Sequence, residues 1–576
     1  MTPWADRALR LASRLSGVSG AVAVVALAVT LVVVGWPVLE SAGHYQFFSG
    51  TGWFPQWTAF DEPAIYGSLS FLFGTLMTAF LGLVAAFPLA FATGLWLGAS
   101  AGPRQRRFAI EWLGFASTWP ALAFGACGLL LVAPVLSKFF GLPRQGYALA
   151  GIVLALMHLP SMALRIAFAL RDVPDTLRDD AALLGATGWQ VLWRLVIPAA
   201  WPGIATAIVL AAIGLAGEAA AVRLVVGTGA SLDPSPFGSG NTLASAQLWA
   251  VQEHTDAAHR PAMFALATLL VLITTFLQAG AWRSNRSPSL AERPDGSILP
   301  SIRLPGLHRF WLAVAGFVAI LATSAAFFGP VVLGVLSLRD GWSRSLADAL
   351  IGSVALSGSA LFVALPAGFL AAHWLAPSPQ SPWARAVQRS ADWLRSVPSC
   401  AIGLVVGAWV LGGYEPVPRG AETVLSGAGL AAWLALSLLL WPTVLQAATD
   451  ALRSVSPAAV ESCRALGASR WQTLMRVQLP AAWRLILWGA VLAFGRGLGE
   501  TAAMVLTAGV AEGGPLSWRG ATPYLAGFAF HRLDDSNATP VRLAEASEAL
   551  AVLLLLWTGT YVAGRFIARP RWWLPG

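Results

Sequence analysis

Apolar segments of about 20 residues or more recur along the whole 576-residue sequence. A helix of roughly 20 apolar residues is long enough to cross the hydrocarbon core of a lipid bilayer. Only 11% of the residues are charged, whereas soluble proteins contain about 25%. Because so few charges cannot cover the surface of a water-soluble fold, we predict an all-α, polytopic membrane protein that resides in a lipid bilayer.

The apolar segments predict twelve transmembrane helices. They cover residues 19–42, 67–98, 109–135, 147–169, 198–227, 262–281, 310–334, 347–376, 396–411, 428–450, 485–511 and 544–564. The basic N-terminus followed by an apolar run resembles a signal peptide, but the run is long and no small-residue cleavage site follows it. We therefore expect the first segment to remain as a transmembrane helix.

Basic residues are unequally divided between the two sets of loops. The tails and the loops on the side of the N-terminus contain 25 of the 37 basic residues, and the opposite loops contain 9. Cytoplasmic loops of membrane proteins are enriched in Lys and Arg, so we expect both termini to be cytoplasmic. The same enrichment explains the net charge of +9, and we do not expect nucleic-acid binding.

Three arginines, Arg165, Arg223 and Arg496, fall inside predicted spans. An arginine in hydrocarbon costs at least ~2.5 kcal/mol, so such residues usually face a protein interior or a water-filled path. Arg165 lies near the end of its span, where a long side chain can also extend to the interface.

The sequence contains an internal repeat. Adding 282 to the residue number carries Pro160 to Pro442, Arg171 to Arg453, Gly185 to Gly467, Pro198 to Pro480 and Glu218 to Glu500, and adding 278 carries Gly74 to Gly352, Pro88 to Pro366 and Pro120 to Pro398. Each copy has six predicted spans, an even number, so the two copies have the same orientation in the membrane. This arrangement predicts a transport pathway at the interface of two homologous halves.

The repeat defines the expected domains. We expect a first half over residues 1–282 with its core at 67–281, and a second half over residues 310–576 with its core at 347–564. The polar, proline-containing segment 283–309 is predicted to be a cytoplasmic linker between them.

The best-conserved part of the repeat is a cytoplasmic loop, which begins at Arg171 in the first half and at Arg453 in the second. Each loop predicts a short helix, a glycine break, an amphipathic helix and a proline turn into the next span. Gly185 and Gly467 permit a backbone conformation that a side chain would hinder. A loop helix that merely lies on the membrane surface is the alternative.

These loops resemble the coupling loop of binding-protein-dependent ABC importer permeases, in which a short helix docks on a cytoplasmic ATPase subunit. The resemblance implies an ABC importer type I permease fold and places the coupling motif on Asp179, Asp180, Ala181, Gly185 and Pro198, and on Glu461, Ser462, Cys463, Gly467 and Pro480. Asp in place of the usual Glu, and Ser-Cys in place of Ala-Ala, keep the charge or the small size.

Further motifs resemble phosphate-type permeases of this family. HYQFFSGTGWFPQW, from His44, is similar to the external loop of one permease subunit, and FGRGLGETAAMVLTAG, from Phe494, is similar to the arginine-x-x-glycine-glutamate-threonine signature of the other. The resemblance extends over nearly the whole chain, from about residue 20 to residue 565. It implies that two permease subunits are fused in one chain.

The signature points to a translocation pathway that contains Glu218, Arg223, Arg496, Glu500 and Thr501. Arg496 precedes Glu500 by four residues, one helical turn, and a guanidinium suits phosphate oxygens. A buried ion pair that only fixes helix packing is the alternative. In the first half Gly214 replaces the arginine and Ala219 the threonine, so we hypothesise that Arg223 supplies the missing cation.

A built-in ATPase is not expected, because the phosphate-binding Walker loop needs a lysine before Ser or Thr and Lys138, the only lysine, is followed by Phe139. The seven histidines lack metal-ligand spacing, and no nucleophile–base arrangement is present, so neither a metal site nor a catalytic site is expected. ATP and Mg²⁺ are expected on partner ATPase subunits.

We therefore predict the permease of a bacterial ABC importer of inorganic phosphate in the cytoplasmic (inner) membrane. Two ATPase copies would bind the coupling loops, and a periplasmic or extracellular phosphate-type binding protein would deliver the anion. The alternatives are a permease for another oxyanion such as sulfate or molybdate, an ion-gradient-driven secondary transporter with the same twelve-span repeat, an intramembrane enzyme, and a regulatory permease.

Overall fold

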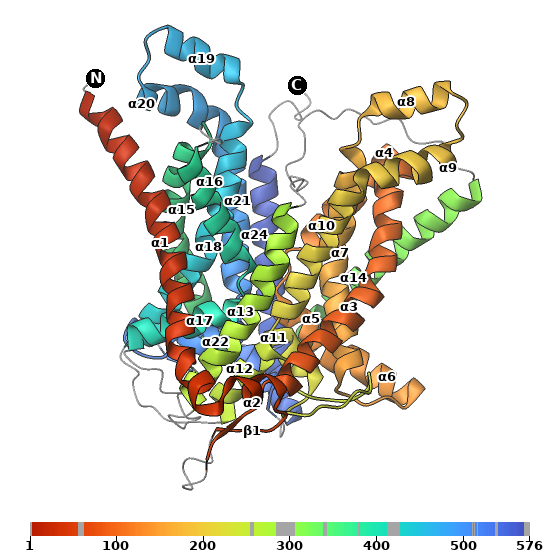
Figure 1. Ribbon diagram of the computed structural model, residues 1–576, viewed down its shortest axis with the longest axis vertical. Coiled ribbons are helices and arrows are strands. Elements are labelled where there is room, and N and C mark those ends of the chain that lie inside the picture. Colours follow the sequence, from red (N-terminus) through yellow and green to blue (C-terminus); the bar gives the residue numbers. More distant parts are fainter. Residues whose placement is uncertain are drawn as a thin grey trace. The chain divides into compact units, whose positions relative to one another are not determined.

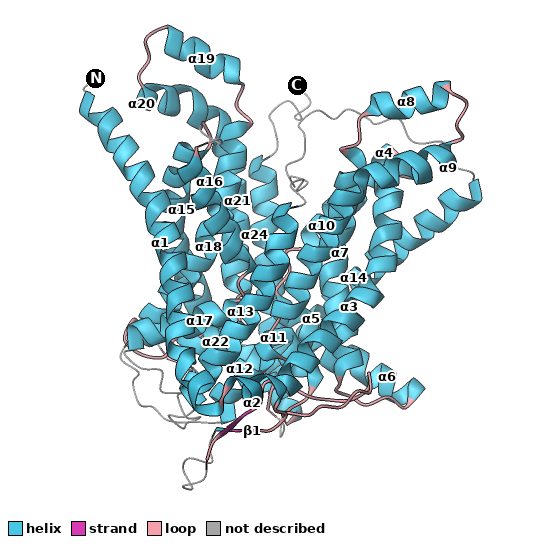
Figure 2. Ribbon diagram, in the orientation of Figure 1, coloured by secondary structure: helices cyan, strands magenta, loops and turns pink. Residues whose placement is uncertain are grey.

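The computed structural model describes residues 3–55, 63–253, 259–283, 306–337, 343–377, 381–411, 427–509, 511, 513–514, 517–535 and 539–568. Most of the predicted linker, residues 284–305, lies outside these ranges. Among the described residues the structure is almost entirely helical (Figure 2). The exception is a two-stranded antiparallel sheet of β1 (Trp53–Phe54) and β2 (Ile65–Tyr66), which pairs Trp53 with Tyr66.

The helices of the first 283 residues are labelled in Figure 1. They are α1 (Pro3–Ala42), α2 (His44–Ser49), α3 (Leu69–Leu95), α4 (Pro103–Ala116), α5 (Ala121–Cys127), α6 (Ala133–Phe140), α7 (Tyr147–Arg171), α8 (Asp175–Leu183), α9 (Gly188–Gln190), α10 (Ile197–Gly217), α11 (Ala220–Val226), α12 (Leu243–Glu253) and α13 (His259–Arg283). Three π-helical turns extend this series, at Trp96–Ser100, Gly128–Val132 and Val191–Val196.

The remaining helices belong to residues 306–568. They are α14 (Gly306–Ser337), α15 (Arg344–Leu375), α16 (Pro382–Ser396), α17 (Ser399–Leu411), α18 (Ala428–Arg453), α19 (Pro457–Ala465), α20 (Arg470–Thr473), α21 (Leu479–Gly499), α22 (Ala502–Thr507), α23 (Leu525–Leu533) and α24 (Pro540–Ala568), with a π-helical turn at Leu474–Gln478 before α21.

Eleven helices within the described ranges are long and apolar enough to cross a membrane, and the bent pair of α16 and α17 raises the number to twelve. The prediction of an all-α polytopic protein is confirmed. One predicted span was placed wrongly. Residues 109–135 do not form one helix, because Pro120 disfavours helical backbone at Trp119 and α5 starts only after it. The predicted span 396–411 corresponds to α17 (Ser399–Leu411), which is bent by 103° from α16.

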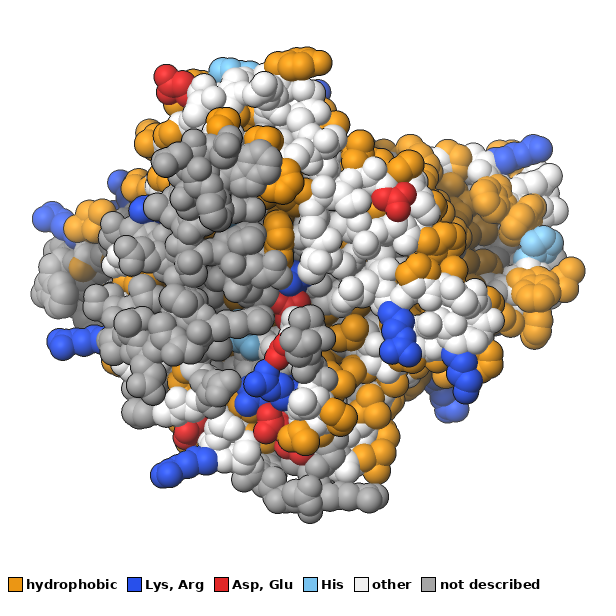
Figure 3. All heavy atoms as spheres, turned by 90° about the horizontal axis from the view of Figure 1, so that it is seen from below, with side chains coloured by type: hydrophobic (Ala, Val, Ile, Leu, Met, Phe, Trp, Pro, Cys, Tyr) orange, Lys and Arg blue, Asp and Glu red, His pale blue; other side chains and the backbone are white. Residues whose placement is uncertain are grey.

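The exposed surface of the spans is apolar, as a lipid-facing surface must be. In α1, Leu27 and Leu31 are buried, whereas Val25 and Val33 on other faces are more than 60% exposed. The end of the molecule seen in Figure 3, on the side where α2 and α6 lie in Figure 1, exposes acidic and basic side chains among hydrophobic ones, whereas the spans expose apolar side chains along their length. Such extensive exposed apolar surface is incompatible with water and marks a membrane-embedded protein.

The chain forms two compact units. One consists of Met1–Ser41, Ala250–Thr268 and Gly334–Gly576, and the other of Ala42–Trp249 and Leu269–Leu333. The units are therefore composed differently from the two sequence halves, since α1 belongs with the second repeat and most of α14 belongs with the first. The division of the sequence into halves at 283–309 stays a prediction.

The first helix of each sequence half packs on the repeat of the other half. In one unit, Ser16 of α1 donates to the carbonyl of Ala367 (2.5 Å). In the other unit, Trp112 Nε1 donates to Thr323 of α14 (3.2 Å), and the ring of Phe327 of α14 packs at a tilt against that of Trp119 with ring centroids 4.6 Å apart.

The two repeats make equivalent contacts at equivalent residues. A Cβ on Gly125 would lie 2.7 Å from Cα of Ala221, and a Cβ on Gly403 would lie 2.7 Å from Cα of Ala503. The glycines thus let α5 approach α11, and α17 approach α22, at backbone distance, as small residues do between membrane helices. Likewise, Thr75 accepts from Leu243 N (2.9 Å) and Ser353 accepts from Leu525 N (2.8 Å).

Candidate coupling loops and translocation site

The first predicted coupling loop contains the expected short helix, α8. Asp179 and Asp180 are exposed on it, and Ala181 is half-buried. Gly185 ends the segment with a φ of +84°, a left-handed conformation that glycine adopts without cost. Thr187 then accepts from Gln190 N (3.3 Å) and donates its own N–H to the Gln190 side chain (2.9 Å), which starts α9.

The second loop repeats this geometry. Glu461 and Ser462 are exposed on α19, and Cys463 is half-buried. Gly467 has a φ of +82°. Ser469 and Gln472 form the same reciprocal cap at 3.3 and 2.9 Å, the capping box of a helix N-terminus.

Both loops lack the predicted proline turn. Pro198 and Pro480 lie near the start of α10 and α21, within continuous helices over Gly188–Gly217 and Arg470–Gly499. A π-helical turn ends two residues before each proline. The wider turn accommodates the missing backbone N–H, so the chain passes from the loop into the span without a break.

Sequence reasoning missed an apolar element of these loops. Leu184 and Leu466 are equivalent residues that directly precede the glycines, and each is 89% exposed. A leucine beside an acidic helix in a polar loop is the signal that could have identified them. Together with the carboxylates, they give each loop a charged and apolar exposed surface.

A buried arginine supports α8, the helix of the first candidate coupling loop. Arg178 is 6% exposed and donates to the carbonyl of Leu170 (2.5 Å), with Asp175 at 3.5 Å. Arg106 of α4 is also buried. Burial lowers the pKa of both guanidinium groups, and for Arg106 the charges of Arg171 and Arg178 lower it further. Arg178 therefore anchors the base of α8 rather than its exposed surface.

The helices α1 and α14, each of which packs on the repeat of the other sequence half, also contact these loops. In one unit, the carboxylate of Asp6 in α1 accepts from the backbone N–H groups of Arg470 (3.3 Å) and Trp471 (3.0 Å). In the other unit, the ring of His308 in α14 lies 4.3 Å from that of Trp189, the residue equivalent to Trp471. Each loop is thus fixed from outside its own repeat.

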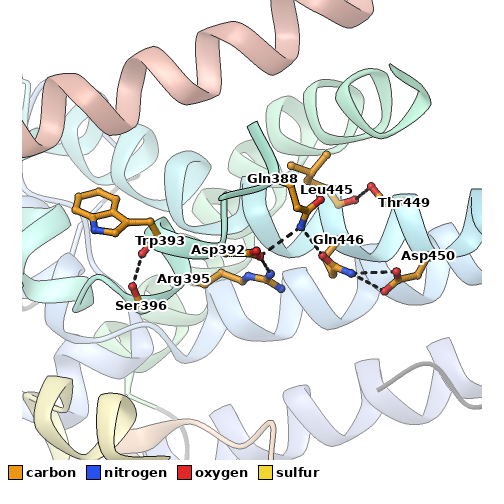
Figure 4. A network of polar contacts seen from close by, with 9 residues as sticks. All are labelled: Gln388, Asp392, Trp393, Arg395, Ser396, Leu445, Gln446, Thr449 and Asp450. Carbon is orange, nitrogen blue, oxygen red and sulfur yellow. Dashed lines mark hydrogen bonds and ion pairs between the residues drawn. The ribbon is translucent and has the colours of Figure 1, made fainter. Parts of the chain in front are cut away.

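A polar network holds α16 against α18, the helix that leads into α19 (Figure 4). Gln388 donates to Asp392 (3.3 Å) and to Gln446 (2.9 Å), and Gln446 donates to both oxygens of Asp450 at 3.0 and 2.9 Å. Asp392 also pairs with Arg395. In both helices a Gln is followed four residues later by an Asp, so the two side chains lie on one helix face. This spacing is the sequence signal that could have identified the network.

Glu218 and Glu500 lie at breaks between helices, not within continuous spans as predicted. Each directly follows the last helical glycine and has extended backbone, with ψ of 126° and 124°. Glu218 accepts from Ala221 N and Glu500 accepts from Ala503 N, both at 3.3 Å. The carboxylates thereby cap α11 and α22, in membrane helices where free backbone N–H groups are costly. Hydropathy does not reveal these breaks. The Gly-Glu pair that occurs at the same position in both repeats is the sequence signal that could have located them.

The expected turn-to-turn pairing of Arg496 with Glu500 is not formed among the described residues. Arg496 donates to Thr443 of α18 at 3.2 Å. The helix ends between the two residues, so a four-residue spacing no longer brings the side chains together. Thr501 is buried in the turn before α22. Arg223 is buried in α11, and its role as a substitute cation stays a prediction.

Paired repeats of membrane helices, interrupted by capped breaks at acidic residues and extended by exposed helix–glycine–helix loops, are the architecture of a membrane permease. The sequence model of the family described as binding-protein-dependent transport system inner membrane component matches residues 90–281 and again residues 364–569. These two matches cover well over half of the chain.

Curated relatives agree with this match. The phosphate transport system permease protein PstC of Pasteurella multocida is 31% identical over 262 residues, which are 40% of this chain and 79% of the relative. The probable ABC transporter permease protein YqgH of Bacillus subtilis is 30% identical over 209 residues (36% and 66%). PstC of Haemophilus influenzae is 26% identical over 299 residues (48% and 91%).

The chain belongs to the family of binding-protein-dependent transport system inner membrane components, and the resemblance seen in the sequence is confirmed. It is the multi-pass permease subunit of an inner-membrane transport system. The double match, with relatives that each cover less than half of the chain, indicates a fused duplication.

Proposed function

We propose that the chain is the complete membrane path of an ATP-driven importer of inorganic phosphate. The observation that carries the proposal is the pair of equivalent loops, each with an exposed acidic helix, an exposed leucine and a left-handed glycine. Two loops in one chain suit two copies of a cytoplasmic ATPase subunit, which would supply the bound ATP and Mg²⁺. The names of the PstC relatives support phosphate as the substrate.

The orientation belongs to the same proposal. The excess of basic residues on one side supports a cytoplasmic location of both termini and both coupling loops. A periplasmic or extracellular phosphate-type binding protein then delivers the anion to the opposite side. Closure of the ATPase pair moves the docked loops, and the rigid helices that continue from them transmit the movement to the breaks at Glu218 and Glu500.

Reconstitution tests the proposal. The chain is placed in proteoliposomes with its ATPase subunit and a phosphate-binding protein, and uptake of labelled phosphate is measured with and without ATP. We expect accumulation only with ATP and with the ATPase subunit. Uptake of sulfate or molybdate in preference to phosphate would identify another oxyanion permease, and phosphate uptake driven by an ion gradient without the ATPase would identify a secondary transporter.

A further inference from the structure

A cavity of about 240 Å³ lies entirely inside the unit that contains the first repeat. Its wall is formed by the turn between α4 and α5, by α7 and by α10. The polar side chains that line it are Ser117, Trp119, His158, Ser161 and Arg165, and the other lining residues are apolar. None of these lining residues, all of which the structure describes, is acidic.

Two hydrogen-bonding atoms of this wall are buried without a partner. They are Nε1 of Trp119, a side chain that is only 6% exposed, and Nε2 of His158. A buried donor without an acceptor costs ~1–3 kcal/mol. The indole N–H donates only, and an imidazole with its proton on Nε2 also donates. Two such groups beside the guanidinium of Arg165 form a wall that suits an anion.

The repeat shows what these residues replace. In the second half, Arg496 of α21 donates to Thr443, which is the equivalent of Ser161 in the cavity wall. In the first half the arginine position is Gly214, and a Cβ there would lie 2.3 Å from Cε1 of His158. Glycine therefore leaves room for the histidine in place of the arginine.

The other donors of the cavity wall also differ between the two halves. The second-half equivalents of Trp119, His158 and Arg165 are all apolar, namely Val397, Leu440 and Ala447. The first half therefore carries an arginine on α7 (Arg165) where the second half has Ala447, and the second half carries one on α21 (Arg496) where the first half has Gly214. Arg223, which the sequence suggested for the same role, is not among the residues that line the cavity.

We propose that this cavity is an oxyanion-binding subsite of the first half, in which Trp119, His158 and Arg165 donate to the oxygens of a free inorganic phosphate ion during transport. The proposal rests on the proposed function. The donors come from the α4–α5 turn and from α7, and no carboxylate lines the cavity, which suits a small anion. The cavity is too small for a whole phospholipid headgroup with its acyl chains.

The test uses the reconstituted importer and the residues of the second repeat. His158→Leu, Arg165→Ala and Trp119→Phe each remove one donor, and each is expected to lower the maximal rate of ATP-driven phosphate uptake by about 10-fold, the loss that one charge-assisted hydrogen bond represents. Lys138→Ala, which removes an exposed cation of the same half outside the cavity, is the matched control and is expected to transport normally.

Two further variants separate binding from folding. His158→Gln keeps a donor and is expected to retain most of the uptake. The triple variant His158→Leu, Arg165→Ala and Gly214→Arg rebuilds the second-half arrangement in the first half, and recovery of uptake relative to His158→Leu and Arg165→Ala together is expected. A purely structural role would not be rescued by an arginine on the opposite helix.

The outcomes are distinct. If the wild-type complex accumulates phosphate and the three single variants do so at the same rate, this inference is wrong and the proposed function stands. If the wild-type complex accumulates no phosphate, both fail. Binding of labelled phosphate to the permease is compared in phosphatidylcholine vesicles with and without phosphatidylglycerol, and loss of binding in the anionic vesicles would mean that the cavity holds a lipid phosphate group, which would also overturn the inference.

Discussion

Single residues decide how closely the helices of this permease approach one another. Gly125 and Gly403 are equivalent in the repeat, and both occupy positions where a side chain would collide with the backbone of the neighbouring helix. Glu218 and Glu500, also equivalent, cap the helix that begins after each break. Packing and capping at these four positions explain why the glycine and the acid recur at the same spacing in both halves.

Gly403→Ala is expected to destabilise the protein by ~1–3 kcal/mol, because the new methyl group must displace the backbone of α22. The midpoint of thermal unfolding in detergent measures the effect. Gly559→Ala in α24 is the control, since no atom lies within 4 Å of a Cβ there and alanine favours the helix by about 1 kcal/mol. Equal midpoints for the two variants would contradict the close approach.

Glu500→Gln and Glu500→Ala separate the cap from the charge. Glutamine still accepts from Ala503 N, so its unfolding midpoint is expected to match that of the wild type, whereas alanine is expected to lose ~0.5–2 kcal/mol of stability. Phosphate uptake is expected to fall in both variants if the carboxylate serves the pathway. Normal uptake by Glu500→Gln would leave the residue with a structural role alone.

At the scale of elements, the sequence predicted the type and order of the helices but not their interruptions. Long apolar runs and the repeat register are strong signals, and they located most of the spans and the two helix–glycine–helix loops. Hydropathy is insensitive to a backbone turn inside an apolar run, so the breaks at Glu218 and Glu500, and that before α5, were missed. The cavity beside His158 was also unpredictable, because it arises from residues on α7, α10 and the α4–α5 turn that only the fold brings together.

The exposed leucines Leu184 and Leu466 belong to this scale, because under the proposed function they form part of the surface on which the ATPase subunit docks. Leu184→Asp and Leu466→Asp are expected to leave the unfolding midpoint unchanged, because both side chains are 89% exposed. Each should weaken binding of the ATPase subunit by about 10-fold or more, since burying a leucine is worth ~1.5–3 kcal/mol.

Co-purification of the ATPase subunit from membranes at several salt concentrations measures that binding. Leu232→Asp is the matched control, an exposed leucine in a loop outside both coupling loops. Undiminished recovery of the ATPase with both coupling-loop variants would show that the leucines are not in the docking surface.

At the scale of the whole molecule, the two compact units exchange helices between the sequence halves. α1 packs with the second repeat and most of α14 with the first. The fused chain is therefore not simply two independent subunits joined end to end, because each compact unit is incomplete without a segment from the other half of the sequence.

Separate expression of residues 1–293 and 294–576 tests this interdependence. Each fragment alone is expected to be degraded or to aggregate, because the exchanged helix leaves an apolar face of the other repeat uncovered. Co-expression of the two fragments is expected to restore a complex that purifies through a tag on either one. Stable, monodisperse fragments when expressed singly would contradict the exchange.

The position of α1 also has a consequence for synthesis. Gly20 of α1 packs against Trp441, so about 400 residues must follow the first helix before that contact can form. At ~5–20 residues per second, the helix waits roughly 20–80 s in the membrane before its partner leaves the ribosome. Lipids or an insertion chaperone must shield its inward face during this interval, which makes the first helix inserted one of the last to reach its final place.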